Sequence, residues 1–315
     1  FANKIWNAGR FVIGALDQAP AAPLAAPEWS LADSWIWARL QGLEREVERL
    51  FAAYQFGEAG RQIYDFFWSE FADWYLEIAK LQLNAGGDSA FYTAQTLARV
   101  LDACLRLLHP FTPYVTEELW GHLKRAAEAK SEHFTPRGGW SEALMLAAWP
   151  EANQDEGWEA QKLEDFALVQ EIIRAVRNVR ADKKVEPSKR IAAVIAAGER
   201  LPVVQSQAAS IAALAGIDPA ALSLVGALEQ KSEGSVSLVV SGVEIHLPLS
   251  GLVDQSLEQA RLQKELAEVE SQIGRIEGLL GSSFAQKAPP PVVEKERQKL
   301  ATYQETAAKL REQLG

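Results

Sequence analysis

Three polar side chains share one face of a helix predicted over residues 1–16. Lys4, Asn7 and Arg10 are three residues apart, a spacing that places them on the same side of a helix. Lys, Asn and Arg donate hydrogen bonds to the base edges of unpaired nucleotides, and an aromatic ring such as Phe11 stacks on a base. The face is therefore either a nucleic-acid contact or an ordinary solvated surface, and Phe11 is either a stacking ring or part of the core.

A second row of cations lies on a helix predicted over residues 155–181 and just beyond it. Arg174, Arg177, Arg180 and Lys184 are spaced by three, three and four residues. Cations on one helical surface suit phosphate groups, which position a nucleic acid without reading its sequence. The alternatives are a charged face paired with nearby acids, or a face that locks this helix to another domain.

Residues for catalysis and for metal binding are missing from the sequence. We find no nucleophile–base pair, no glycine-rich phosphate loop and no paired buried carboxylates. The single cysteine, Cys104, lies in an apolar helical run and excludes an internal disulfide and any multi-cysteine zinc site. We therefore expect no catalytic residue and no metal site in this chain.

The C-terminal 60 residues carry two heptad runs on either side of a proline-rich segment. The first run is Leu262, Leu266, Val269, Ile273, Ile276 and Leu280, and the second is Leu300, Tyr303, Ala307, Leu310 and Leu314. One apolar stripe on each of two neighbouring helices predicts a coiled-coil seam. Pro289 to Pro291 cannot continue a helix, so we expect the chain to turn there. The result is an antiparallel hairpin on the order of 35–40 Å long, at about 1.5 Å per residue.

The rest of the chain predicts a mainly α fold with a small α+β unit. Helices are expected over 1–16, 33–54, 58–83, 89–108, from 113 onward, and over 155–181, with N-caps at Asp33 and Thr112. The β-branched segments 190–197 and 236–249 predict strands, with a helix near 206–215 and a short strand near 222–228 between them. We divide the chain into a helical domain (1–185), an α+β subdomain (186–252) and a coiled-coil arm (253–315).

The composition of the chain limits the kinds of partner that it could bind. The 315 residues carry a net charge of −10, which argues against indiscriminate nucleic-acid binding. Residues 171–200 nevertheless hold eight basic and four acidic side chains, which is a local basic footprint. No apolar run reaches the length of a membrane span and no signal segment opens the chain. We expect a cytoplasmic protein that has no membrane partner.

Several segments resemble a known family. NKIWNAGRF (3–11), YDFFWSEFADWYLEIAK (64–80), LLHPFTPYVTEELW (107–120) and IRAVRNVRADKKVEPSK (173–189) resemble the anticodon-binding helical domain of class I aminoacyl-tRNA synthetases of the valine, isoleucine and leucine group. FAQKAPPPVVEKERQKL (284–300) is similar to the C-terminal arm of valyl-tRNA synthetases. The resemblance covers nearly the whole chain. The family's catalytic signatures, HIGH and KMSKS, do not occur in it.

The resemblance implies a role in tRNA recognition without chemistry. It implies that Lys4, Asn7, Arg10 and Phe11 contact the anticodon of valine isoacceptor tRNAs, and that the cations of 174–184 contact the tRNA backbone. For the arm it implies contacts of Lys287 and Arg297 with the tRNA corner. It further implies that ATP with Mg²⁺ acts only in a parent enzyme, whose catalytic and editing domains would precede Phe1. We expect this chain to be monomeric, to need no cofactor and to be inactive alone.

Two alternatives remain at this point. The chain is similar to the isoleucine and leucine enzymes as well, but the former typically end in a cysteine-rich zinc module and the latter lack the hairpin. The other alternative is a non-catalytic helical scaffold whose heptads mediate protein–protein association, which the acidic net charge favours.

Overall fold

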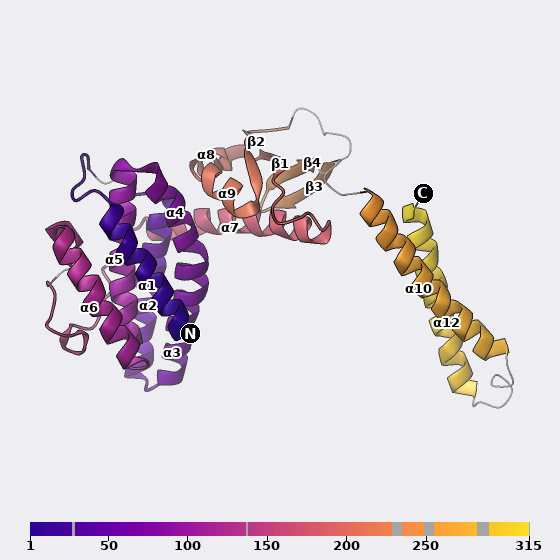
Figure 1. Ribbon diagram of the computed structural model, residues 1–315, viewed down its shortest axis with the longest axis horizontal. Coiled ribbons are helices and arrows are strands. Elements are labelled where there is room, and N and C mark those ends of the chain that lie inside the picture. The colour runs from indigo at the N-terminus through magenta and orange to yellow at the C-terminus, as the bar shows by residue number, and fades with distance from the viewer. Residues whose placement is uncertain (27–28, 137, 229–234, 249–254, 282–289, 315) are drawn as a thin grey trace.

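The computed structural model describes the chain except for residues 27–28, 137, 229–234, 249–254, 282–289 and 315. Figure 1 shows three units in chain order: a helical bundle, a small sheet flanked by helices, and a two-helix hairpin that stands apart from both. The predicted mainly α fold with an α+β subdomain and an antiparallel hairpin is confirmed.

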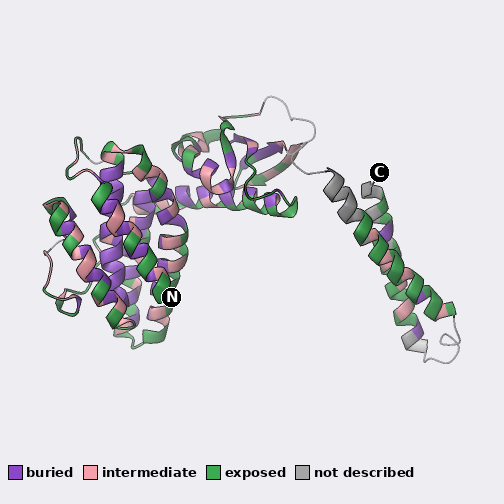
Figure 2. Ribbon diagram, in the orientation of Figure 1, coloured by how far each residue is buried: buried purple, intermediate pink, exposed green. Residues whose placement is uncertain are grey.

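The bundle is built around one central helix. Its elements are α1 (Ala2–Gln18), α2 (Leu31–Ala52), α3 (Phe56–Asp65), η1 (Phe66–Tyr75), α4 (Leu76–Ala85), α5 (Gly87–Leu108) and α6 (Pro113–Lys130), followed by the short 3₁₀ turns η2 (Glu132–Phe134) and η3 (Leu144–Leu146). Almost every residue of α5 from Ala90 onward is buried, and α1, α2, α4 and α6 all contact it. Figure 2 shows this concentration of buried residues.

The start of α2 differs from the prediction. Ser30, rather than Asp33, is the N-cap, and its hydroxyl accepts a hydrogen bond from the backbone N–H of Asp33. Asp33 lies buried in the first turn and accepts a hydrogen bond of 2.6 Å from the hydroxyl of Tyr75. Burial raises the pKa of Asp33. Either residue suits a cap, and the contact with Tyr75, 42 positions away, could not be read from the local sequence.

The helix predicted over 58–83 contains both α-helical and π-helical turns. It begins at α3, becomes a π-helix in η1 and returns to α-helix in α4. The prediction of one long helix is confirmed, but the π-helical winding in its middle was not expected. π-Helical turns are rare and occur frequently at functional sites. Here η1 presents Trp68 to α1 and Trp74 to the helix that follows the bundle.

Helix α7 (Glu159–Asp182) links the bundle to the sheet. Its first half packs on α2, where the rings of Phe166 and Trp35 stack with centroids 4.1 Å apart, and its second half packs under the sheet. Its apolar side is buried, including Ile172, Ile173 and Val176. Because this helix contacts both units, it joins the bundle to the sheet by packing.

The α+β unit holds one four-stranded mixed sheet. Strands β1 (Ile191–Ala196), β2 (Ile217–Val225), β3 (Ser235–Val240) and β4 (Val243–Pro248) lie in the order β2-β1-β4-β3. β1 is parallel to β2 and antiparallel to β4, and β3 and β4 form a hairpin. Helices α8 (Leu201–Ser206) and α9 (Ala208–Ala215) connect β1 to β2. The strand structure predicted over 236–249 is confirmed, and it is divided into the two strands β3 and β4.

The C-terminal hairpin consists of α10 (Gln255–Gly281) and α12 (Pro290–Leu314). Along α10, the predicted seam residues Leu266, Val269, Ile273 and Leu280 are partly covered and Ile276 is buried. Leu262, Leu310 and Leu314 belong to the predicted seam, but their side chains lie outside the described part of the chain. Contrary to the prediction, Pro290 and Pro291 begin the second helix, because the first turn tolerates residues without an N–H.

Candidate nucleic-acid interface

The predicted polar face of α1 is a surface of the bundle. Asn7 and Arg10 are exposed and Lys4 is half-buried, while Ile5 and Val12 on the opposite side are fully buried. The three polar residues therefore share one open helical face, as their spacing predicts.

Lys4 is held in place from η1. Its ammonium group lies 2.6 Å from a carboxylate oxygen of Asp73 and 3.7 Å from the ring centroid of Trp68. A cation over an indole face is attracted by the ring quadrupole. The positive charge of Lys4 is therefore already engaged within the protein. Any RNA contact by Lys4 would have to share this charge with Asp73 or displace it.

Arg10 and Asn7 are the available donors on this face. Among the described residues, neither side chain has a hydrogen-bond or ion-pair partner. Phe11, next to Arg10, is half-buried and packs against the core, as the second alternative for it expects. Lys80 of α4 lies 5.8 Å from the Phe11 ring centroid and adds a cation that the sequence analysis missed. Only tertiary packing brings α4 to this end of α1.

The aromatic residues of η1 divide between the core and the surface. Phe66, Phe67, Phe71, Trp74 and Tyr75 are buried, so this row is core rather than a stacking platform. Trp68 is the exception, since it is half-exposed beside Lys4.

The basic row of α7 is only partly a surface. Arg174 and Arg177 are exposed, and their guanidinium carbons lie 5.3 and 5.7 Å from the ring centroid of Trp74. Arg177 also donates a hydrogen bond of 2.6 Å to the carbonyl of Leu214. Lys184 is exposed just after the helix ends, with a left-handed backbone (φ 52°). These three cations remain accessible to a phosphate group.

Arg180 does not share that surface. It is 8 % exposed, and its guanidinium donates to the carbonyl oxygens of Gly216 at 2.7 Å and Glu186 at 3.2 Å. Gly216 has a φ of +70°, and a Cβ built there would lie 2.9 Å from the guanidinium carbon. The expected phosphate contact at Arg180 is therefore corrected. This arginine satisfies backbone carbonyls where α7 meets the α+β unit, a role that the row of cations in the sequence did not distinguish.

On the arm, Arg297 is exposed on α12, and no described residue pairs with it. Lys287 lies outside the described residues, so its position is not compared. The two helices are joined across their exposed sides by Arg311 and Glu270, whose nitrogen and oxygen are 2.6 Å apart.

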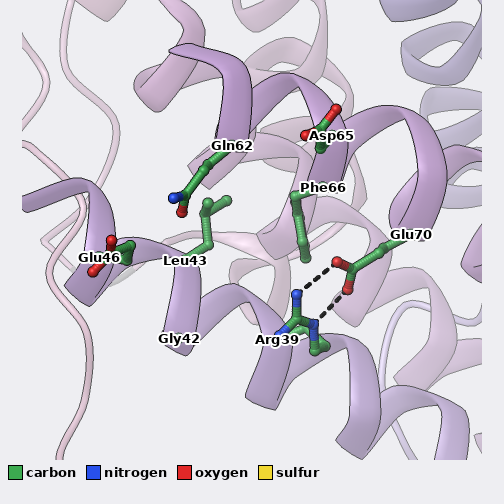
Figure 3. A pocket seen from close by; sticks show the side chains of 8 residues that line it. All are labelled: Arg39, Gly42, Leu43, Glu46, Gln62, Asp65, Phe66 and Glu70. Carbon is green, nitrogen blue, oxygen red and sulfur yellow. Dashed lines mark hydrogen bonds and ion pairs between the residues drawn. The ribbon is translucent and has the colours of Figure 1, made fainter. Parts of the chain in front are cut away.

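Two hollows lie on the bundle, and the charges that line the first do not suit RNA. The first, of about 370 Å³, lies between α2 and the α3–η1 helix, where Arg39 forms a two-point ion pair with Glu70 (Figure 3). Its other charged residues, Glu46 and Asp65, would repel phosphate. The second, of about 490 Å³, has the buried Glu44 in its lining. Burial raises the pKa of Glu44 to about 7, and the charge of Asp102 adds to the effect, while Gln41 and Arg45 oppose it.

Within the described part of the chain, no group of three or more His, Cys, Asp and Glu side chains is arranged to hold a metal ion. Cys104 is buried in α5, and burial raises the pKa of its thiol well above the usual range. Nor is any helix among the described residues both long and apolar enough to cross a membrane.

Two regions of the chain match models of known protein families. Residues 33–195 match the family model of the anticodon-binding domain of tRNA ligases, and residues 254–315 match that of the valyl-tRNA synthetase tRNA-binding arm. The arm match separates this chain from the isoleucine and leucine alternatives.

Curated proteins of similar sequence agree with these family matches. The chain is 40 % identical to a valine–tRNA ligase of Symbiobacterium thermophilum over 100 % of its own length and 35 % of that protein. It is 37 % identical to that of Bacillus subtilis, over 96 % of this chain and 33 % of the relative. The chain thus spans about a third of the length of these relatives. From these matches and from the fold, the chain belongs to the family of tRNA-ligase anticodon-binding domains and ends in a tRNA-binding arm of the valyl-tRNA synthetase type.

Proposed function

We propose that this chain is the tRNA-binding part of a valine–tRNA ligase, and that the parent enzyme attaches valine to its tRNA with ATP. The observation that carries the proposal is the ordered pair of matches, anticodon-binding domain and then arm, on one chain. The preferred partners are valine isoacceptor tRNAs. ATP and Mg²⁺ would act in the catalytic domain of the parent.

The proposed anticodon contacts are Asn7, Arg10 and Phe11, with Lys4 acting while held by Asp73. Arg10 supports this proposal most directly. Its side chain is exposed, has no hydrogen-bond or ion-pair partner among the described residues, and lies next to the half-buried ring of Phe11. Unpaired anticodon bases present both edges for hydrogen bonds and faces for stacking.

The proposed backbone contacts are Arg174, Arg177 and Lys184. The corner of the tRNA would meet the arm near Lys287 and Arg297. The three-part division at 185/186 and 252/253 is part of the proposal, as are a cytoplasmic location, a monomeric state, and catalytic and editing domains that precede Phe1 in the parent.

A binding titration tests the proposal. The 315-residue chain is titrated with valine tRNA and with the same tRNA carrying a changed anticodon, at several salt concentrations. We expect tighter binding of the unchanged tRNA and a fall in affinity as salt rises, because phosphate contacts release counterions. Equal affinity for both RNAs, or binding that ignores salt, would contradict it.

Variants separate the two kinds of contact. Arg10→Ala should lower affinity for the unchanged tRNA and reduce discrimination between the two anticodons. The double variant Arg174→Ala/Arg177→Ala should weaken both RNAs alike and flatten the salt dependence. Arg45→Ala is the control, because this exposed arginine of α2 pairs with Asp155 away from these surfaces.

A further inference from the structure

The chain gathers positive charge where α7 ends and β1 is about to begin. We call residues 182–190 the basic turn. Its charged side chains are four cations and two acids, namely Lys183, Lys184, Lys189 and Arg190 with Asp182 and Glu186. All six are exposed. The turn is therefore a basic surface on a chain whose net charge is −10.

The lysines of the basic turn have no acidic partner, unlike many cations of the bundle. In the bundle, Lys4 pairs with Asp73, and Arg39 forms its two-point pair with Glu70. No ion pair joins the three lysines of the turn to a described residue. Cations that are not neutralised within the protein attract the phosphates of a nucleic acid, because binding then releases the counterions of the phosphates.

The backbone at Lys184 gives an independent observation. The N–H of Lys184 bonds to the carbonyl of Ala181 at 3.0 Å and the N–H of Val185 to that of Arg180 at 2.9 Å, while Lys184 has a φ of 52°. This arrangement is a Schellman motif, and its left-handed position favours glycine. A lysine there is strained, and its exposed side chain makes no ion pair with a described residue. Strain of this kind points to a use of the ammonium group outside the chain.

Arg180 holds the basic turn from beneath. Its guanidinium donates to the carbonyl oxygens of Glu186, in the turn, and of Gly216, at the end of α9. Each of these oxygens accepts a second hydrogen bond, the first from the N–H of Lys189 at 3.0 Å and the other from the N–H of Ile191 at 3.2 Å. One buried side chain therefore joins the turn to the first residue of β1 and to α9.

Gly216 leaves the space that this guanidinium needs. Because a Cβ at position 216 would lie 2.9 Å from the guanidinium carbon of Arg180, alanine there would push the side chain away from its carbonyl partners. Such a change disturbs the support of the turn without adding or removing a charge. The structure thus offers a way to separate the shape of the turn from its charge.

We propose that the basic turn is a binding surface for the backbone phosphates of RNA and that Arg180 is its positioning residue. The proposal rests on the proposed function and extends its backbone contacts to Lys183, Lys189 and Arg190. Arg180 does not itself touch RNA. It holds the turn in the form that exposes the cations, and a turn that is already ordered binds without the entropic cost of ordering it.

Two variants that conserve charge test the positioning role. The affinity of the 315-residue chain for valine tRNA is measured at several salt concentrations, and the slope of log affinity against log salt is compared. Lys184→Ala should reduce this slope by about one, because one phosphate contact is lost. Gly216→Ala and Arg180→Lys should reduce it similarly and weaken binding by roughly threefold or more at the lowest salt, although neither changes the net charge.

Gly198→Ala is the matched control for Gly216→Ala. Gly198 lies in the turn Gly198–Arg200 of the same unit, also has a positive φ (+54°), and has open space where a Cβ would stand. Both alanine variants impose backbone strain, so both should lower Tm. Only Gly216→Ala should change the salt slope, since only there does the new methyl group meet Arg180. Circular dichroism checks that each variant is folded.

Four results would contradict the inference. Unchanged slopes in the folded variants Gly216→Ala and Arg180→Lys would remove the positioning role. An equal change of slope in Gly198→Ala would assign the effect to lost stability. Equal weakening of binding to heparin would make the turn a general polyanion surface rather than one for RNA. Absence of salt-dependent tRNA binding by the unaltered chain would contradict the proposed function as well, whereas the first two results contradict this inference alone.

Lys184→Gly sharpens the role of the strained lysine. It should raise Tm by ~2 °C, because glycine relieves the left-handed strain, and should reduce the salt slope by about one. Tyr54→Gly is the matched control, since Tyr54 follows the end of α2 with a similar backbone (φ 56°) and is 82 % exposed. It should raise Tm without changing tRNA affinity. A gain in Tm with an unchanged slope in Lys184→Gly would exclude Lys184 from the surface.

Discussion

The bundle and the arm are both made of long helices, but they are held together in different ways. In the bundle, α5 is buried on nearly all sides and contacts α1, α2, α3, α4 and α6. In the arm, Ile276, Val293 and Ala307 are the buried side chains among those described. A helix surrounded by partners is fixed by packing, whereas a hairpin with one seam depends on its heptad pattern and on its turn. The bundle can therefore present a defined face to RNA, while the arm supplies reach.

The largest difference between the bundle and the arm is expected when a buried side chain is truncated. Phe67→Ala, in the bundle core, should lower the free energy of unfolding by about 3–5 kcal/mol, because a fully buried ring leaves a cavity. Ile276→Ala should leave the main denaturant transition in place and reduce only the helicity contributed by the arm. Urea unfolding followed by circular dichroism measures both. Equal shifts of the main transition would show that arm and bundle unfold together.

The next largest loss of stability is expected when a buried ion pair in the bundle is removed. Arg106 lies 3.0 Å from Asp102, and both side chains are nearly covered; Asp102 also accepts a hydrogen bond of 2.7 Å from Trp120. Arg106→Ala should cost about 3 kcal/mol at pH 8, because the carboxylate stays buried without its cation. The cost should shrink at low pH, where protonation of Asp102 removes the charge. A cost that does not change with pH would contradict an electrostatic origin.

Glu44 predicts a pH dependence of stability that belongs to the bundle alone. Its pKa is about 7 in the folded state against 4.5 as the reference, so between these values the folded state binds more protons than the unfolded state. Stability should fall as pH rises from about 4.5 to 7, by roughly 3 kcal/mol in total. Glu44→Gln should remove this dependence, making the variant more stable than the parent at pH 8 and similar near pH 4.5. Thermal melts across pH measure the difference.

The smallest effect is expected at the exposed ion pair of the arm. Arg311→Ala removes the contact with Glu270, and both side chains are about half exposed. Solvent screens such pairs, so the loss should be below about 1 kcal/mol. A double-mutant cycle with Glu270→Ala, read from arm helicity at low and high salt, measures it. A coupling as large as that of Arg106 with Asp102 would mean that the two regions are stabilised alike after all.

Much of the fold follows from periodicity. The spacing of apolar residues predicts the long helices and the seam of the arm, and proline at position 113 marks the start of α6. The π-helical winding of η1 was not predictable, because a 3.6-residue pattern reads the same aromatic row as one helix. The division of 236–249 into two strands was also missed, since the turn at Ser241 and Gly242 lies within a continuous β-branched run.

The candidate site was predictable to a lesser degree. The sequence places Asn7 and Arg10 on one open face, but it cannot show that Asp73 and Trp68 hold Lys4 or that Lys80 lies over Phe11. Arg177 and Arg180 look equivalent in a row of cations, yet one is exposed and the other is buried against Gly216.

The sequence by itself determined which faces of the helices are apolar, that two heptad runs pair into an arm, and that the family's catalytic signatures are absent, because each of these is a local pattern. Tertiary structure alone decided which cations remain free, which aromatic rings meet at the surface and which carboxyl groups are buried. Those properties depend on neighbours far apart in the chain, and burial and pairing set the energy of a charged or aromatic side chain.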